Sequence, residues 1–156
     1  MRSICALLDK KLILLKQLLD LLEQETIALQ NLTHTELQHL ANSKESCLDQ
    51  LNPLAIEHEN LLKEKNYSCT HEGMLSYIHQ EMAGKEQTQA KELWLDIQLA
   101  LKKCKQINEA NGLVIQVNQA QLSSLLNVVK GCEENTYGPQ GEKESTASIK
   151  GSRSTA

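Results

Sequence analysis

Histidine and cysteine side chains are the groups of this sequence that could hold a metal or perform catalysis. His58-Glu59 resembles the start of the two-histidine helix motif of zinc proteases, but residue 62 is leucine, so the second histidine ligand is missing. Cys69, His71 and His79 could bind a metal only if a loop folded around it, and their spacing matches no standard zinc site. We therefore predict neither a metal nor another cofactor.

Other catalytic arrangements are also missing from the sequence. His34 and His39 are five residues apart and would point to different faces of a helix. There is no glycine-rich phosphate loop and no nucleophile elbow. A small basic cluster of Lys102, Lys103 and Lys105 is most simply a solvated helix face, although a surface for an acidic partner is an alternative. We predict that the chain is not an enzyme.

Composition and charge limit the classes of partner. The chain has 156 residues, enough for one domain or a domain with a tail. Aromatic residues make up 3% with no phenylalanine, so no base-stacking platform is available, and the net charge of -4 argues against nucleic acid as the main partner. The five cysteines include no Cys-x-x-Cys pair, which is typical of reduced cytoplasmic thiols. Charges at Asp9, Lys10 and Lys11 interrupt the N-terminal apolar run, so we expect neither a signal peptide nor membrane insertion.

The spacing of apolar residues predicts an all-α fold, an antiparallel bundle of three long helices plus a short helix. A broad leucine stripe on the first segment needs more than one neighbouring helix to cover it. We place the helices at about 3–31, 33–66, 71–82 and 85–130, in a bundle of residues 1–132 followed by a disordered tail at 133–156. The tail has few large apolar groups to offset the entropy of ordering, and Gly131 could cap the last helix.

The junctions between these helices have sequence signals of their own. Thr33 and Glu36 have the spacing of a capping box, which predicts a helix start and a hairpin, although one continuous helix across the junction remains possible. Pro53 should kink or restart the second helix. Trp94, near the start of the longest helix, is more typical of a bundle anchor than of a ligand platform.

The longest helix has two unusual residues in its middle. Its apolar seam repeats in steps of three and four, and Asn111 puts an amide on that seam, next to Gly112. A buried amide must be hydrogen-bonded, so the pair suggests a close helix–helix contact of fixed register. The alternative is a locally weak, partly solvated turn.

The end of this helix is rich in apolar side chains. A helix of about 45 residues spans nearly 70 Å, against roughly 45 Å for the first two, so some of this surface should lack an internal partner. The side chains are Leu122, Leu125, Leu126, Val128 and Val129. An amphipathic helix of another protein would suit such a strip, but the short helix at 71–82 or a second copy of the chain could also cover it, and the oligomeric state stays open.

Taken together, the sequence resembles the FlgN-type flagellar export chaperones. The resemblance rests on the leucine-rich first helix, the second helix with Lys44, Leu48 and Leu51, and Trp94. It rests above all on two motifs, Asn108-Glu109-Ala110-Asn111-Gly112 and Tyr137-Gly138-Pro139-Gln140-Gly141.

This resemblance implies a cytoplasmic chaperone that binds C-terminal helical segments of the hook-filament junction proteins, prevents their premature assembly and delivers them to the type III export gate. It also implies that the strip from Leu122 to Val129 binds the client and that Tyr137 docks to the export gate. Two alternatives remain: a related secretion chaperone or helical adaptor with another client, such as the filament cap protein, and a helical enzyme or metal protein.

Overall fold

The computed structural model describes residues 3–134, 140–142 and 146–148, with side chains described for residues 3–118 and 120. The chain divides into two compact units, Met1–Gly112 and Leu113–Ala156, and the division falls inside the longest helix.

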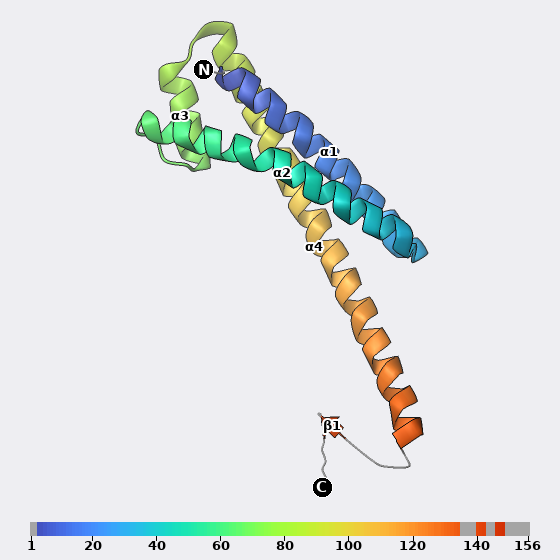
Figure 1. The fold of residues 1–156 in the computed structure, drawn as a ribbon. Coiled ribbons are helices and arrows are strands. Elements are labelled where there is room, and N and C mark those ends of the chain that lie inside the picture. The colour runs from blue at the N-terminus through green and yellow to red at the C-terminus, as the bar shows by residue number, and fades with distance from the viewer. Residues whose placement is uncertain (1–2, 135–139, 143–145, 149–156) are drawn as a thin grey trace. The chain divides into compact units, whose positions relative to one another are not determined.

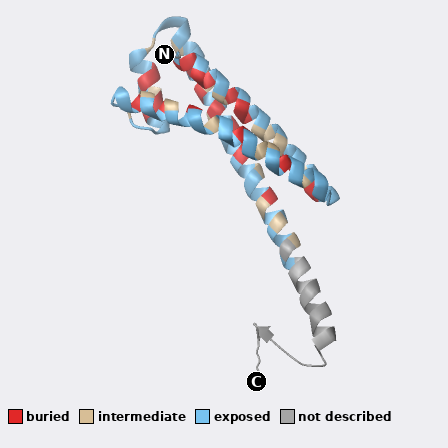
Figure 2. Ribbon diagram, in the orientation of Figure 1, coloured by how far each residue is buried: buried red, intermediate tan, exposed pale blue. Residues whose placement is uncertain are grey.

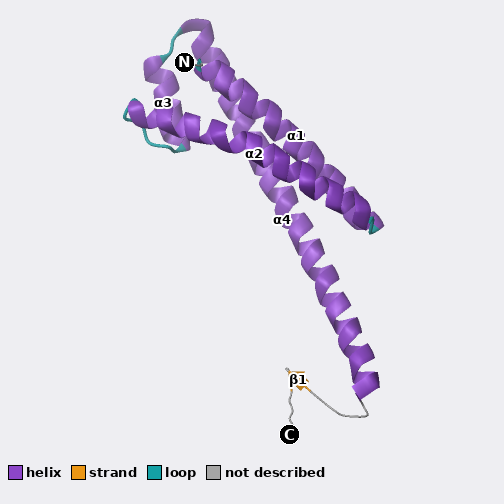
Figure 3. Cartoon of the chain, in the orientation of Figure 1, coloured by secondary structure: helices purple, strands orange, loops and turns teal. Residues whose placement is uncertain are grey.

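The described part of the chain contains four helices. Figures 1 and 3 show their arrangement. They are α1 (Ile4–Asn31), α2 (His34–Glu64), α3 (His71–Glu81) and α4 (Gly84–Glu134). The prediction of an all-α fold with three long helices and a short one is confirmed. The two-residue break at Leu32 and Thr33 also settles the junction in favour of a hairpin.

Polar contacts give the directions of the helices in the first unit. Lys11 on α1 lies beside His58 on α2, and Glu25 on α1 beside Lys44 on α2, so these two helices run antiparallel. The Cys104 thiol contacts the Leu15 carbonyl and the Asn111 amide contacts the Leu22 carbonyl, so α4 runs parallel to α1. Helix α2 is therefore antiparallel to both of its long neighbours.

Leucine side chains fill the core of this unit, because the helices turn their apolar faces toward one another (Figure 2). The broad stripe of α1 is buried as predicted, with Leu7, Leu8, Leu12, Leu14, Leu15, Leu22 and Leu29 all below 9% exposure. The seam of α4 is buried at Ala90, Trp94, Ile97, Ala100, Cys104 and Asn111. Both periodicities therefore identified the faces that pack.

The contacts that end and begin the helices at the junctions differ from those that the sequence predicted. Thr33 precedes α2 as predicted, but its side chain makes no capping hydrogen bond, so the capping-box interpretation is wrong. Instead Leu32 adopts a left-handed conformation with φ of 53°, and the Thr33 amide donates to the Ala28 carbonyl, which closes α1 with a C-terminal cap. Pro53 lies inside α2, which continues past it without a restart.

The connection between α2 and α3 depends on a glycine. Thr70 caps α3, and its hydroxyl accepts a hydrogen bond of 3.0 Å from the Gly73 amide. A Cβ added at Gly73 would collide with the backbone carbonyl of Ser68, so no other residue fits this turn without movement of the loop.

The second unit contains the rest of α4 and two short strands. Helix α4 continues through Gly131 to Glu134, so Gly131 does not end it. Strands β1 (Gln140–Glu142) and β2 (Thr146–Ser148) pair antiparallel. An isolated pair of three-residue strands is marginally stable at best, and the disorder of the tail in isolation stays a prediction. Across the described residues, no helix is long and apolar enough to cross a bilayer.

Candidate functional site

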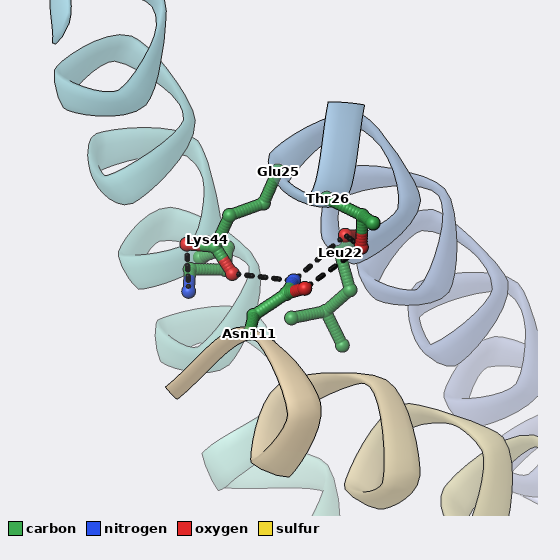
Figure 4. A network of polar contacts seen from close by, with 5 residues as sticks. All are labelled: Leu22, Glu25, Thr26, Lys44 and Asn111. Atoms are coloured by element: carbon green, nitrogen blue, oxygen red, sulfur yellow. Dashed lines mark hydrogen bonds and ion pairs between the residues drawn. The ribbon is translucent and has the colours of Figure 1, made fainter. Parts of the chain in front are cut away.

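Five residues from three helices form a buried polar network in the first unit (Figure 4). We call it the register cluster; it comprises Leu22, Glu25, Thr26, Lys44 and Asn111. Helix α1 supplies three of these residues, α2 supplies the lysine and α4 supplies the asparagine. The cluster thus connects all three long helices at one level of the bundle.

The Asn111 amide is fully used within this cluster. Its nitrogen donates to the Leu22 carbonyl and to Glu25 Oε1, both at 3.0 Å, and its oxygen accepts from the Thr26 hydroxyl at 2.8 Å. A reversed amide would place an oxygen against two acceptors, so the network also fixes the orientation of the side chain. Asn111 is only 2% exposed, which agrees with a register contact and not with a solvated turn.

Charge compensation makes the burial of Glu25 possible. Its carboxylate lies on the leucine face of α1, and its second oxygen pairs with Lys44 Nζ at 2.7 Å. The Lys44 side chain retains 21% exposure, so the lysine connects the buried carboxylate with solvent. Slippage of α4 by one helical turn would move Asn111 about 5.4 Å from all these partners.

The neighbours of Asn111 in its motif behave differently. Asn108 is exposed on α4. A Cβ at Gly112 would meet nothing within 4 Å, so the expected close helix contact at this glycine is wrong. Within this motif, the contacts that fix the register therefore come from Asn111 and not from Gly112.

A second polar cluster lies in the core where α1, α2, α3 and α4 meet. We call it the His58 cluster; it comprises Lys11, His58, His71, Met74 and Trp94. Lys11 can only donate, so its ammonium donates to His58 Nδ1 at 3.0 Å, and His58 Nε2 carries the hydrogen that points to Met74 Sδ at 3.1 Å. The Trp94 indole donates to His71 Nδ1 at 3.0 Å.

Burial and the neighbouring ammonium determine the protonation of His58. Desolvation, followed by the charge of Lys11, lowers the pKa of His58 from 6.5 to about 4. Desolvation also lowers the pKa of Lys11. His58 is therefore neutral near pH 7. It is a core residue whose ring packs edge-on against Trp94, with the two ring centroids 5.5 Å apart. The anchor predicted at Trp94 is confirmed, since it is 7% exposed in the core.

The candidate metal residues are not brought together. Cys69, His71 and His79 are exposed, and His71 bonds to Trp94. No group of three histidine, cysteine or acidic side chains able to hold a metal occurs in the part of the chain that the structure describes.

The residues predicted to bind a client are only partly described. The α4 backbone is helical throughout 122–129, but the side chains of Leu122, Leu125, Leu126, Val128 and Val129 lie outside the described residues, as does Tyr137 altogether. Just before this strip, Leu113, Val114 and Val117 are 62%, 42% and 53% exposed.

Sequence reasoning missed two features of these clusters. Glu25 is three residues after Leu22 and four before Leu29, so its position on the buried stripe was a usable signal for a buried charge. His58 gave the same signal, since it is four residues after Leu54 and four before Leu62, but its neighbour Met74 lies on another helix and could not be identified from this spacing.

The fold and these two clusters define an all-helical bundle protein. The model of the FlgN protein family matches residues 1–145, so the chain belongs to the FlgN family. Membership of this family indicates a chaperone of flagellum biogenesis.

A solved structure supports the same assignment. The crystal structure described as a flagella synthesis protein FlgN from Pseudomonas aeruginosa is similar at a TM-score of 0.65 and 26% identity, covering 82% of this chain and 98% of that one. No curated protein matches the sequence.

Proposed function

We propose that this protein is a cytoplasmic export chaperone that binds C-terminal helical segments of the hook-filament junction proteins and delivers them to the flagellar export gate. The observation that carries the proposal is the match of the FlgN family over residues 1–145, on an all-helical fold. The client segments offer apolar helix faces that would otherwise aggregate or polymerise too early.

The client surface that we propose is the strip at Leu122, Leu125, Leu126, Val128 and Val129. On a continuous helix, residues 122, 125, 126 and 129 recur at the spacing of one face. The exposure of Leu113 and Val117 earlier in the same helix supports a surface that offers apolar contacts. Burial of about 600–1,000 Å² there would give useful but reversible affinity, so release would need no chemistry in the chaperone.

Calorimetry with a peptide of the C-terminal helix of a hook-filament junction protein tests this surface. Leu125→Asp with Val129→Asp should abolish binding while helicity by circular dichroism is retained. The matched control is Ser123→Asp with Asn127→Asp, which adds the same charge at the same spacing on the opposite side of the helix and should bind normally. Unchanged affinity in the first variant would exclude the strip as the client site.

Docking to the export gate is assigned to Tyr137. Tyr137→Ala should leave peptide affinity unchanged and reduce secretion of the junction proteins, and Tyr137→Phe separates the role of the ring from that of the hydroxyl. If Tyr137→Ala loses both binding and secretion, the two roles are not separate.

The identity of the client is tested by affinity purification from cell extract followed by mass spectrometry. Enrichment of the hook-filament junction proteins supports the proposal. Enrichment of the filament cap protein instead would make this chain a chaperone for that client.

A further inference from the structure

The first unit has two surface hollows that share a wall. They have volumes of about 510 and 480 Å³, and Asn52 and Ala55 on α2 line both. The first extends to Leu48 and Leu101, and the second to Leu62 and Trp94. Because α2 and α4 run antiparallel, these pairs mark the two ends of one continuous depression, which we call the α2–α4 groove. Its length along α2, from residue 48 to residue 62, is about 21 Å, or four helical turns.

Apolar side chains form much of this groove and remain open to solvent. Leu48, Ile56 and Leu101 are 51%, 50% and 45% exposed. Helix α1 contributes buried Leu15 and half-buried Lys11, whose ammonium is directed to His58 Nδ1. Exposed leucines gathered along a groove are more typical of a binding surface than the same residues scattered singly.

The two rims of the groove carry opposite charges. On the α2 side Asp49 lines the groove, and Glu45 precedes it by one turn. On the α4 side Lys105 follows Leu101 by one turn, and Lys102 follows the lining residue Gln98 by one turn. All four charged side chains are exposed. A guest in the groove would therefore meet an acidic rim on one side and a basic rim on the other.

Asp49 gives the acidic rim a carboxylate that lines the first hollow. Such a carboxylate can accept two hydrogen bonds from one arginine guanidinium of a guest helix.

We propose that the α2–α4 groove is a second docking site, which takes an amphipathic helix of about four turns from another protein. The apolar stripe of this helix carries basic residues along one edge and acidic residues along the other. The site lies between residues 11 and 101 and so goes beyond the client surface proposed at 122–129. A second copy of this chain fits less well, because no described helix of the first unit offers more than two exposed large apolar residues at helical spacing. The apolar segment at 113–129 contains no charged residue that could match either rim.

The test uses three fluorescein-labelled 18-residue peptides and the full chain. All three have leucines at alternating steps of three and four, which form one apolar stripe. The mixed peptide has arginine along one flank of the stripe and glutamate along the other. The two uniform peptides have either arginine on both flanks or glutamate on both flanks. Reversing a helix end to end exchanges its flanks, so the mixed peptide can always match both rims. It should bind about three- to tenfold more tightly than either uniform peptide by fluorescence anisotropy.

Variants locate the binding on the groove. Leu101→Glu should weaken the mixed peptide at least about tenfold. The matched control is Leu99→Glu, which changes a 54% exposed leucine two residues away that does not line the groove. Glu45→Lys with Asp49→Lys makes both rims basic and should transfer the preference to the all-glutamate peptide. This change of preference cannot result from loss of folding.

Several outcomes would overturn the proposal. Equal affinity for the three peptides would show that the groove does not recognise the charges of its guest. Equal weakening by Leu99→Glu and Leu101→Glu would show that the peptide does not bind in the groove. Loss of binding in Leu125→Asp with Val129→Asp would place the peptide on the client strip instead. A concentration-dependent dimer that Leu101→Glu abolishes and Leu99→Glu retains would make a second copy the occupant.

Discussion

The register cluster and the His58 cluster bury polar groups in the same bundle by different means. In the register cluster a carboxylate and an ammonium compensate each other, with Glu25 and Lys44 at 2.7 Å. In the His58 cluster two basic groups face each other at 3.0 Å, and the histidine stays neutral. The first cluster therefore depends on the presence of both partners, whereas the second depends on pH.

This difference has a consequence for what each cluster contributes. Asn111 and Glu25 have directional partners on all three long helices, so the register cluster specifies alignment. His58 packs edge-on against Trp94 and directs its ring nitrogens to Lys11 and Met74, so the other cluster mainly completes the core. The predictions below separate these contributions.

Removal of Lys44 should have the largest effect. Lys44→Met leaves the Glu25 carboxylate buried without its counter-charge, which should lower the free energy of unfolding by about 3 kcal/mol in urea denaturation. The control is Lys63→Met, which breaks an exposed ion pair with Glu59 and should cost less than about 0.5 kcal/mol. Similar losses in both variants would show that Glu25 is hydrated.

The His58 cluster should make stability depend on pH. The pKa of His58 is about 4 in the folded protein against 6.5 when unfolded, so the unfolded chain takes up its proton first as pH falls. The stability present above pH 6.5 is therefore lost progressively as pH falls toward 4, by about 2 kcal/mol between pH 7 and pH 5. His58→Gln, which cannot titrate, should remove this part of the dependence in denaturation curves measured at both pH values. An identical slope in both proteins would contradict the assignment.

Within the Asn-x-x-Asn motif the two asparagines should differ. Asn111→Ala removes three hydrogen bonds and should cost about 1–2 kcal/mol of unfolding free energy. Asn108→Ala, on the exposed side of the same helix, should be neutral or raise stability by a few tenths of a kcal/mol. Thermal denaturation of the two variants compares them directly, and equal effects would contradict the register role.

The smallest expected change is a gain. Gly112→Ala adds a methyl group in open space and a better helix former, so stability should rise by up to about 1 kcal/mol. A loss of stability, measured by urea denaturation, would mean that Gly112 has a neighbour on the assembled protein.

The helical faces could be predicted from the sequence because burial of a helix depends on its own periodicity. The stripe of α1 and the seam of α4 up to Asn111 were recovered in this way. The side chains that each residue contacts on other helices could not be predicted from the sequence, because they depend on which helices pack together. Leu48 has the apolar spacing of a core residue but faces a groove, and His58 looks like a fragment of a zinc motif but packs beside Met74.

The candidate site illustrates the same limit. The amide of Asn111 was identified as needing a partner, since a polar group on an apolar seam is visible in one segment. The partners themselves, Glu25 and Lys44, could not be predicted from the sequence. They lie on two other helices, and the spacing within one helix does not show that α1 and α4 run parallel. The client strip and Tyr137 stay predictions, which the binding and secretion experiments above address.

Gly73 has a practical use in comparing relatives of this protein. Its backbone amide donates to the Thr70 hydroxyl that caps α3, and its missing side chain leaves room for the Ser68 carbonyl, so an alanine at the equivalent position implies a rebuilt loop. In a sequence alignment, the residue at the position of Gly73 therefore indicates whether the α2–α3 loop of one relative can serve as a template for another. A residue other than glycine there means that the loop must be determined separately.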